Sequence, residues 1–462
     1  MNRADPLPRP VSRRLFGTDG VRGVANVEPV TAETALRLGR AAAEVCLRQA
    51  AGRPRIVVGK DTRWSGDMLE SALAAGLCSR GADVLLTGPL PTPAIAFLTR
   101  ELQAAAGAVI SASHNPFADN GIKFFGPDGF KLPDEVEAEI EEHVLEPDDS
   151  AVPATGSQLG RILPLADGVE RYAQFVRRTL IAPLTLSGLK LVVDCAHGAA
   201  YQVGPRLFRE LGAEVLVLGA DPDGININQG CGAVHPEALQ AKVIAERAYL
   251  GVAFDGDADR VMFVDETGSV VDGDEALAIM AADMLSRGTL RYGTVVGTVM
   301  SNLGLELALR DRGVRLARTR VGDRYVVEEM RHYDYNLGGE QSGHLVFMDQ
   351  TTTGDGLIAA LQLLQVLVRQ QSRLSQLKQV MTKLPQVLLN VPVARRAELE
   401  SLPGVSRTVN RITGALGDRG RVVVRYSGTE PLVRVMVEGE QADQVGAYAE
   451  EIAAAIRLEL TA

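Results

Sequence analysis

Arg55-Ile-Val-Val-Gly59 is a short run of mainly β-branched residues, and it begins the pattern that decides the fold. A continuous apolar run of this length is typical of a parallel strand that is covered on both faces. Two further runs follow, Gly81-Ala-Asp-Val-Leu85 and Gly107-Ala-Val-Ile110. The spacing of about 26 residues between the first two runs suits a strand–helix–strand crossover. We therefore predict a parallel sheet flanked by helices in this part of the chain.

The same pattern recurs twice further along the chain. Each copy has a β-branched strand, a second strand led by glycine and a third apolar strand, at Lys190–Asp194, Gly212–Leu216 and Gly251–Phe254, and at Thr294–Gly297, Gly313–Leu316 and Tyr335–Gly338. Chance similarity among α/β units is the competing explanation. If the copies are real, the loops after their third strands should share one cleft, because ligands gather beyond the carboxyl ends of parallel strands.

The last part of the chain has a different pattern. An amphipathic stretch over 356–382 is followed by short alternating strands and a final helix, at Gln386–Val391, Arg421–Arg425, Leu432–Val437 and Ala442–Leu460. This order favours a small α+β domain. The fold prediction is therefore α/β, with three similar α/β domains around a central cleft and a smaller C-terminal α+β domain. The expected boundaries are 1–166, 167–268, 269–383 and 384–462.

Composition limits the kind of protein. The 462 residues are 46% apolar and 23% charged, which is ordinary for a globular protein, and the formal net charge is −10. An acidic chain argues against general nucleic-acid binding, because phosphate contacts need a basic face. We see neither the apolar core of a signal peptide nor an apolar run long enough to span a bilayer. Four scattered cysteines without metal-ligand spacing favour reduced thiols. We expect a cytoplasmic protein with no nucleic-acid or membrane partner, and the sequence does not indicate its oligomeric state.

Ser111-Ala-Ser-His-Asn-Pro-Phe117 follows the third strand of the first copy. Ser113, with His114 beside it, is therefore displayed where a strand runs into a loop whose shape is fixed by proline. Such a hydroxyl can be a nucleophile or a phosphorylation site. The segment alone is equally well explained as an Asn-Pro turn whose serines cap backbone groups.

The loop after the second copy carries three carboxylates, Asp255, Asp257 and Asp259, at alternate positions. Such closely spaced carboxylates repel one another unless a cation lies among them. Their hard oxygen ligands point to Mg²⁺, and the spacing does not match an EF-hand. A solvated acidic turn is the alternative. Arg260 follows directly and could hold the same phosphate as the metal.

Three further segments carry groups suited to a sugar phosphate. Arg425-Tyr-Ser-Gly-Thr-Glu-Pro431 offers an arginine and hydroxyls to phosphate oxygens, and Gly339-Glu-Gln-Ser-Gly-His344 could bind sugar hydroxyls. Each could equally be a plain loop. Arg22 lies between glycines near the N-terminus, and Lys123 could be a surface charge, a phosphate clamp or an acid–base group.

Taken together and in this order, the motifs resemble those of the α-D-phosphohexomutase superfamily over nearly the whole chain. Within it, Gln341 and the segments Val321–Arg324 and Pro222–Asn228 are most similar to the members that act on glucosamine phosphates, whereas Tyr426 departs from the lysine common there. The resemblance implies a phosphoserine at Ser113 and one Mg²⁺ per active site.

The resemblance also implies roles for individual residues. The metal ligands would be Ser113, Asp255, Asp257 and Asp259. The catalytic set would be Ser113, Lys123, His344, Arg22 and His114. The substrate-binding set would be Arg260, Arg324, Glu340, Ser342, Arg425, Ser427, Gly428, Thr429 and Arg434.

The implied reaction interconverts glucosamine 6-phosphate and glucosamine 1-phosphate through a bound 1,6-bisphosphate, and it would supply UDP-N-acetylglucosamine synthesis. Two alternatives stay open: a phosphoglucomutase or phosphomannomutase of the same superfamily, and a non-catalytic sugar-phosphate sensor on the same fold. An intact Ser113 argues against the sensor, which would need no phosphate carrier.

Overall fold

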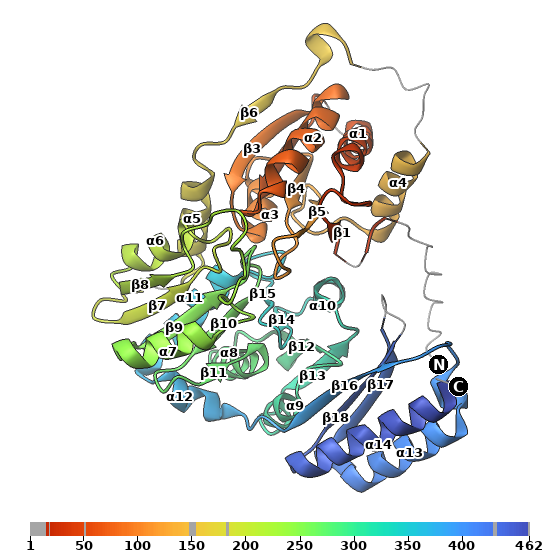
Figure 1. Ribbon diagram of the computed structural model, residues 1–462. Coiled ribbons are helices and arrows are strands. Elements are labelled where there is room, and N and C mark those ends of the chain that lie inside the picture. The colour runs from red at the N-terminus through yellow and green to blue at the C-terminus, as the bar shows by residue number, and fades with distance from the viewer. Residues whose placement is uncertain are drawn as a thin grey trace.

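Four β-sheets, each with its own helices, organise the chain (Figure 1). The computed structural model describes residues 15–17, 19–49, 52–146, 154–181, 184–427 and 432–460. We refer to the parts built on the four sheets as units I to IV, in chain order. Within the described residues, none of the helices is long and apolar enough to cross a membrane.

Unit I is built on a six-stranded sheet in the order β1-β5-β4-β2-β3-β6. Its strands are β1 (Val21–Val24), β2 (Arg55–Lys60), β3 (Asp83–Pro89), β4 (Ala106–Ile110), β5 (Asp119–Phe125) and β6 (Ile162–Pro164). Its helices are α1 (Ala32–Gln49), α2 (Ser65–Ser79), α3 (Thr92–Glu101) and α4 (Asp134–Leu145).

Units II and III are smaller versions of the same plan. Unit II has the order β11-β10-β9-β7-β8, with β7 (Lys190–Asp194), β8 (Glu214–Leu218), β9 (Leu250–Phe254), β10 (Val261–Val264), β11 (Val270–Val271), α5 (Gly168–Arg178), α6 (Val203–Glu210) and α7 (Glu237–Glu246). Unit III has the order β13-β12-β14-β15, with β12 (Thr294–Thr298), β13 (Arg315–Thr319), β14 (Leu337–Gly339), β15 (Leu345–Phe347), α8 (Gly273–Ser286), α9 (Leu303–Arg310), α10 (Asp323–Tyr333), α11 (Gly356–Gln370) and α12 (Leu374–Leu377).

The predicted three-fold repeat is confirmed by the strand pairing. In each unit the first strand of the copy lies in the middle, and the second and third strands pair with it in parallel on either side. A fourth strand, β5, β10 or β15, then pairs antiparallel with the third. The loops after β4, β9 and β14 therefore occupy equivalent positions in the three units.

The second strands begin two residues later than the sequence indicated. Gly81, Gly212 and Gly313 have φ angles of 90°, 95° and 71°, so they form the left-handed turn between helix and strand. Glycine adopts this conformation without steric cost, whereas a strand residue needs negative φ. The glycines that led these runs are thus turn residues, and β3, β8 and β13 start at the second residue after each of them.

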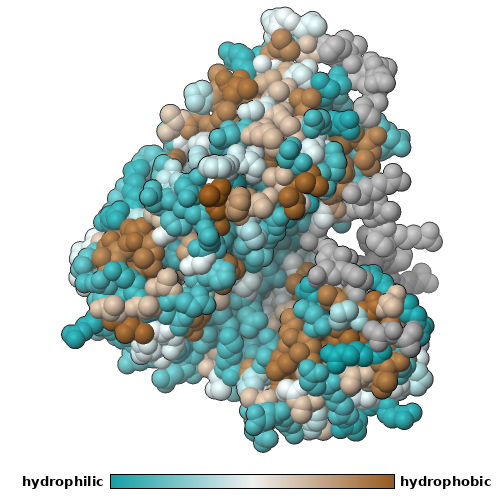
Figure 2. All heavy atoms as spheres, viewed as in Figure 1, coloured by the Kyte–Doolittle hydropathy of each residue, from teal (hydrophilic) through white to brown (hydrophobic). Residues whose placement is uncertain are grey.

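Unit IV is an antiparallel sheet, β16-β18-β17, covered by two helices. It comprises β16 (Gln386–Pro392), β17 (Arg421–Tyr426), β18 (Leu432–Glu438), α13 (Pro403–Leu416) and α14 (Ala442–Leu460). The sequence prediction missed α13, although Val405, Val409, Ile412 and Leu416 follow helical spacing and join the apolar cluster of this unit. In the space-filling view the surface is recessed beside unit IV (Figure 2).

Helix α11 corrects one prediction. Its sequence was interpreted as the start of an amphipathic stretch, but every residue from Gly356 to Leu367 is buried. The helix packs against β10 of unit II as well as α8 and β15 of unit III, so no face is left for solvent. One apolar cluster accordingly runs through units I, II and III, and unit IV has a separate one.

Units I and II are joined by close packing at two places. Helix α3 contacts α5, and the rings of Phe97 and Phe175 stack with centroids 4.1 Å apart. At the second place Trp64 lies against Gly224, where an added Cβ would come within 1.8 Å of the indole ring. The backbone N–H of Trp64 also donates to the Gly224 carbonyl at 3.1 Å. Glycine at position 224 is therefore required for this contact.

Candidate active site

Ser113 lies in the loop after β4 and is 1% exposed. Its hydroxyl donates to Asp255 Oδ2 at 2.6 Å, which brings the loop of unit I against the loop of unit II. The φ angle of Ser113 is +52°, a left-handed conformation that is unfavourable for any residue with a Cβ. Neighbouring contacts must therefore hold this backbone in place.

A buried ion pair supplies those contacts. Arg63 pairs with Asp61, and both side chains are fully buried. Arg63 Nη2 donates to the carbonyl oxygens of Ser113 and Asn115, at 3.2 and 2.5 Å. Asp61 accepts from the Ser111 hydroxyl at 2.6 Å, and that hydroxyl accepts the Ser113 N–H at 2.9 Å. The pair thus fixes the loop from both sides.

Asn228 of unit II completes this support, because its Nδ2 donates to the Ser113 carbonyl at 2.9 Å. Sequence reasoning missed Asp61, Arg63 and Asn228. The Asp61-Thr-Arg63 segment follows β2, which ends at Lys60, and is a strand-end loop like those that were identified. Position after a strand was therefore a usable signal for Asp61 and Arg63.

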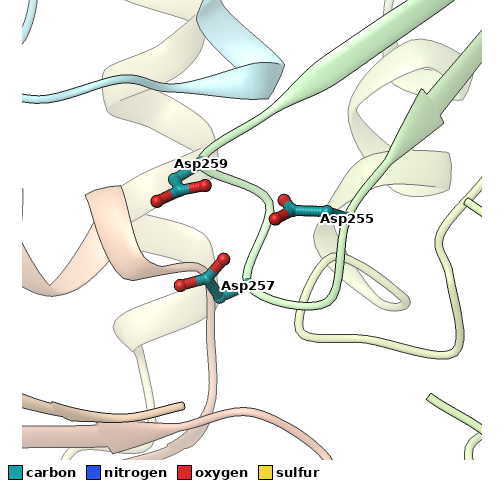
Figure 3. Close-up of side chains that lie close together, drawn as sticks. All are labelled: Asp255, Asp257 and Asp259. Atoms are coloured by element: carbon teal, nitrogen blue, oxygen red, sulfur yellow. The ribbon is translucent and has the colours of Figure 1, made fainter. Parts of the chain in front are cut away.

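The three aspartates lie in the loop between β9 and β10 and face a common centre (Figure 3). All are buried, and one oxygen atom of each lies within 4.8 Å of one oxygen atom of each of the others. Asp257 Oδ1 and Asp259 Oδ1 are buried and have no hydrogen-bond partner among the described residues. Burial, followed by the negative charges of Asp259 and Asp257, raises the pKa of Asp255 to about 8. Buried carboxylates with unpartnered oxygen atoms fit a bound cation.

Lys123 projects from β5 to the same place and is 2% exposed. Its Nζ lies 3.0 Å from Asp257 Oδ2, 3.1 Å from Asp19 Oδ2 and 4.0 Å from Asp259 Oδ2. Burial lowers the pKa of Lys123, but the charges of Asp19 and Asp257 outweigh it and raise the pKa above the usual value. The side chain is therefore a cation next to Ser113's loop.

Thr92, at the start of α3, was also missed. Its hydroxyl donates to Asp257 Oδ2 at 2.7 Å, and its N–H donates to the Asp257 carbonyl at 2.9 Å. With Lys123, it occupies Oδ2 and leaves Oδ1 of the same carboxylate for a ligand. Nothing in the local sequence of Thr92 indicates this role, because it depends on unit I meeting unit II.

His344 lies behind Asp259 and is 2% exposed. Its Nδ1 is 3.7 Å from Asp259 Oδ2, and its Nε2 accepts the Gly354 N–H at 3.0 Å. Burial lowers the pKa of His344, whereas Asp259 and then Asp323 raise it above its usual value. Protonating Nε2 would forfeit the bond from Gly354. This placement allows His344 to orient Asp259, and its predicted catalytic role stays a prediction.

The other residues of the predicted sugar loop lie at the end of β14. Glu340 is 9% exposed and its Oε1 accepts the Gly322 N–H at 3.1 Å. Ser342 Oγ is buried without a hydrogen-bond partner among the described residues. A hydroxyl and a carboxylate are therefore held close to the triad by unit III.

Three more predicted residues lie beside Ser113, the triad or Asp19. His114 Nδ1 is 3.4 Å from Ser113 Oγ. Burial, with the charges of Arg260 and Arg22, lowers the pKa of His114 to about 4, so its ring is neutral near pH 7. Arg260 Nε is buried without a hydrogen-bond partner in the described chain and lies 3.9 Å from Asp259 Oδ1. Arg22 pairs with Asp19.

Arg324 lies between units I and III. Its guanidinium pairs with Asp134 and, at 2.7 Å, with Glu137, both on α4. The side chain is 8% exposed and links α10 to α4. Two carboxylates thus compensate the charge of Arg324, and its substrate-binding role stays a prediction.

Unit IV presents two arginines side by side. Arg425 of β17 is the register partner of Arg434 of β18. Burial and then the charge of Arg434 lower the pKa of Arg425, and Arg425 Nε is buried without a hydrogen-bond partner in the described part of the chain. Ser427 follows at the end of β17 and is buried. The predicted residues Gly428 and Thr429 lie outside the described residues.

Comparison with known proteins defines the class. Models of the phosphoglucomutase/phosphomannomutase family match the chain in four parts: alpha/beta/alpha domains I, II and III at residues 13–151, 170–268 and 272–384, and the C-terminal domain at 388–455. The chain belongs to this family of enzymes, and the α-D-phosphohexomutase resemblance inferred from the motifs is confirmed.

Curated relatives within this family are phosphoglucosamine mutases. The chain is 54% identical to the phosphoglucosamine mutase of Syntrophotalea carbinolica, with 97% of this chain and 98% of the relative covered. It is 56% identical to the phosphoglucosamine mutase of Anaeromyxobacter sp. Fw109-5, with 97% and 96% covered.

Solved structures agree in fold. A phosphoglucomutase/phosphomannomutase family protein from Burkholderia thailandensis is 26% identical, with a TM-score of 0.78 over 96% of this chain and 97% of the other. N-acetylphosphoglucosamine mutase of Aspergillus fumigatus, solved in complex with GlcNAc-6P and magnesium, is 18% identical, with a TM-score of 0.69 over 97% and 96%. The second likeness concerns the fold alone.

Proposed function

We propose that this enzyme is a phosphoglucosamine mutase that interconverts glucosamine 6-phosphate and glucosamine 1-phosphate through a phosphorylated Ser113. The observation that carries the proposal is the contact of 2.6 Å between Ser113 Oγ and Asp255 inside the buried carboxylate triad. A serine destined only to cap a turn has no need of three buried carboxylates beside its hydroxyl. The phosphoglucosamine mutases among the relatives support the choice of sugar.

Asp255, Asp257 and Asp259, with the phosphate on Ser113, would hold a Mg²⁺ ion. All of these ligands are hard oxygen atoms, and the unpartnered Oδ1 atoms of Asp257 and Asp259 are suited to it. When bound, the ion supplies positive charge that neutralises the phosphoryl group during transfer. Lys123 and Arg260 add fixed positive charge around the same group.

In the first transfer the C1 hydroxyl of glucosamine 6-phosphate attacks the phosphorus atom of phosphoserine. The new O1–P bond forms as the Ser113 Oγ–P bond breaks, and the bound product is the 1,6-bisphosphate. The C1 hydroxyl loses a proton and Ser113 Oγ gains one as its bond to phosphorus breaks, so no net proton is needed; the neutral His114, 3.4 Å from Ser113 Oγ, can relay that proton to the departing oxygen. Lys123, which stays protonated, stabilises the charge of the transferring group.

The bisphosphate must then turn so that its 6-phosphate returns to Ser113. During each transfer the phosphate that is not reacting needs a separate anchor. Arg425 and Arg434 form that anchor, because two neighbouring guanidinium groups attract an anion and Arg425 Nε is buried without a partner among the described residues. Ser427, Gly428 and Thr429 complete the phosphate loop in this proposal, and Glu340 with Ser342 binds the sugar hydroxyls.

The cellular setting follows from this chemistry. The substrate is a small sugar phosphate, and the product would feed UDP-N-acetylglucosamine synthesis. Because that substrate is a polar cytosolic metabolite, we place the enzyme in the cytoplasm, without a nucleic-acid or membrane partner.

A coupled assay that compares glucosamine, glucose and mannose phosphates, each with glucose 1,6-bisphosphate as activator, tests the proposal. We expect the highest kcat/KM with glucosamine phosphate. A higher value with glucose or mannose phosphate would reassign the enzyme to the phosphoglucomutase or phosphomannomutase alternative. Absence of turnover with all three, and of a phosphate adduct at Ser113 by intact mass, would favour a sensor.

A further inference from the structure

Asp19 joins the two lysines of unit I that face the site. Its carboxylate contacts Lys123 Nζ at 3.1 Å and also pairs with Lys131. Lys123 in turn contacts Asp257 of the triad at 3.0 Å. Asp19 therefore lies between two cations, Lys123 beside the triad and Lys131 farther from it.

The line of charges continues across to unit III. Lys131 pairs with Asp323, which is the first residue of α10. Asp323 Oδ2 lies 3.8 Å from His344 Nε2, and His344 Nδ1 lies 3.7 Å from Asp259. These contacts thus form a closed ring that leaves the triad at Asp257 and returns to it at Asp259, with the imidazole of His344 as the link between the carboxylates of Asp323 and Asp259.

Units I and III also meet through Arg324 of α10, whose guanidinium pairs with Asp134 and Glu137 of α4, and through a further polar seam. Arg331 contacts Asp128 at 3.5 Å and lies over the ring of Phe130, and the Thr352 hydroxyl donates to the Gly129 carbonyl at 2.6 Å. A pocket of about 220 Å³ separates the two units beside these contacts. Shape alone therefore does not fix unit III against unit I, in contrast to the aromatic stacking between units I and II.

We infer that Asp19, Lys131 and Asp323 are positioning residues for phosphoryl transfer. They fix the positions of Lys123, which contacts Asp257 of the metal-binding triad, and of His344, which lies beside Asp259. They also fix the sugar-binding loop of unit III relative to Ser113 in unit I. None of the three needs to touch the substrate, because each acts through the group that it orients.

The charged groups of Asp19, Lys131 and Asp323 are largely buried. Side-chain exposure is 12% for Lys131, 22% for Asp19 and 15% for Asp323, so each charge depends on its neighbours for compensation. Removing the ammonium of Lys131 leaves two carboxylates facing each other, and they must move apart. Because Asp19 contacts Lys123, the movement reaches the reacting centre, where a displacement of about 1 Å can cost on the order of 100-fold in rate.

The test compares three variants. Lys131→Met keeps the length of the side chain and removes its charge, and Lys131→Arg restores the charge. Arg331→Met is the matched control, because it removes another cation from the same seam but lies outside the ring. The inference rests on the proposed function only through the choice of substrate, so the sugar phosphate that the wild type turns over best is used throughout.

We expect Lys131→Met to lower kcat by on the order of 10- to 100-fold with a KM change below about three-fold, and Lys131→Arg to recover most of kcat. The kcat of Arg331→Met should stay within about two-fold of that of the wild type. Equal kcat values for Lys131→Met and Arg331→Met would overturn the inference, and so would a loss that appears only in KM.

Thermal unfolding of each variant shows whether it is folded. If Lys131→Met does not fold, the isosteric Asp323→Asn replaces it, with the same expected fall in kcat, and a kcat equal to that of the wild type would then overturn the inference. A wild type that is inactive on glucosamine phosphates but active on another hexose phosphate rejects the proposed substrate. The ratio of variant to wild-type kcat still tests the ring.

Discussion

At the scale of the residue, Ser113 combines a strained backbone with a reactive position. Its left-handed conformation costs about 1 kcal/mol relative to glycine. The buried Arg63–Asp61 pair and Asn228 hold it there by accepting and donating the hydrogen bonds of the loop. A fixed backbone keeps Ser113 Oγ beside the triad, where the unmodified hydroxyl donates to Asp255.

Replacing Ser113 tests the carrier role. We expect Ser113→Ala and Ser113→Gly both to lose at least about 1,000-fold in turnover, because neither can carry a phosphate. Ser113→Gly should melt at a temperature no lower than that of Ser113→Ala, since glycine relieves the positive φ. Coupled assays, intact mass and thermal unfolding supply the readouts. Substantial mutase activity in either variant would reject a phosphoserine mechanism.

Asp257→Asn tests the metal site. The amide can still accept from Thr92 and Lys123 through one oxygen atom, but it removes the charge that a cation needs. We expect the Mg²⁺ concentration for half-maximal activity to rise at least about ten-fold and the maximal rate to fall. Calorimetric Mg²⁺ titration measures binding directly. Asp167→Asn, at an exposed carboxylate paired with Arg171, is the control. An unchanged titration and rate would exclude Asp257 as a ligand.

Residues that carry chemistry in a local motif could be predicted from the sequence, and residues that act across units could not. Ser113 and the three aspartates stand in short motifs after apolar strands, and the structure brings them together. Thr92 reaches Asp257 only because α3 of unit I begins beside the triad loop of unit II. The contact of Arg324 with α4 could not be foreseen for the same reason, because Asp134 lies 190 residues away in the sequence.

At the scale of the element, the spacing of apolar residues and the positions of turn glycines allowed most strands to be predicted. The middle and third strands of all three copies were located within about two residues, since burial on both faces leaves a continuous apolar run. Helix α11 was misinterpreted because its glutamines suggested a polar face. Gln362 is buried, and its side chain donates to the Thr179 carbonyl at 3.2 Å.

Helix α8 carries a pH-dependent element of stability. Its N-cap is Asp272, and Asp274 in its first turn is buried. Burial, followed by the charge of Asp272, raises the pKa of Asp274 from 3.8 to about 7. Between about pH 4 and pH 7 the unfolded chain has lost this proton while the folded chain keeps it. The contribution of Asp274 to the free energy of unfolding therefore falls as pH rises through that window.

Asp274→Asn should remove this slope. An amide oxygen can still accept the Asn302 N–H, now at 2.7 Å from Asp274 Oδ2, without a charge to bury. We expect the variant and the wild type to have similar melting temperatures at pH 4.5. As the pH rises to 8, the variant should become more stable than the wild type, by about 1–3 kcal/mol in the free energy of unfolding. Melting curves at several pH values measure the difference. A gap that is constant with pH would contradict the assignment.

At the scale of the whole molecule, unit IV is the separable part. Its apolar cluster contains only residues between 387 and 460. Polar groups attach it to unit III: Glu438 accepts the Leu303 N–H at 3.0 Å, and Arg421 donates to the Ser301 carbonyl at 2.9 Å. A unit with its own core and a polar attachment can move as a body over the cleft.

We therefore expect a fragment of residues 384–462 to fold by itself. Circular dichroism should show mixed helix and strand, and thermal unfolding should be cooperative, because all residues of the apolar cluster belong to the fragment. A matched fragment of unit III, residues 269–383, should not fold, since α11 and α8 belong to an apolar cluster shared with units I and II. A disordered unit IV fragment would contradict the prediction.

The contact between Trp64 and Gly224 has a practical consequence. Trp64 is the single tryptophan of the chain, and it is 68% exposed at the junction of units I and II, next to the Arg63 that supports Ser113. Its indole emission therefore reports on one place in the molecule. Any shift between the two units as phosphate arrives at or leaves the serine would change the solvent exposure of this ring, and the tryptophan emission would record it.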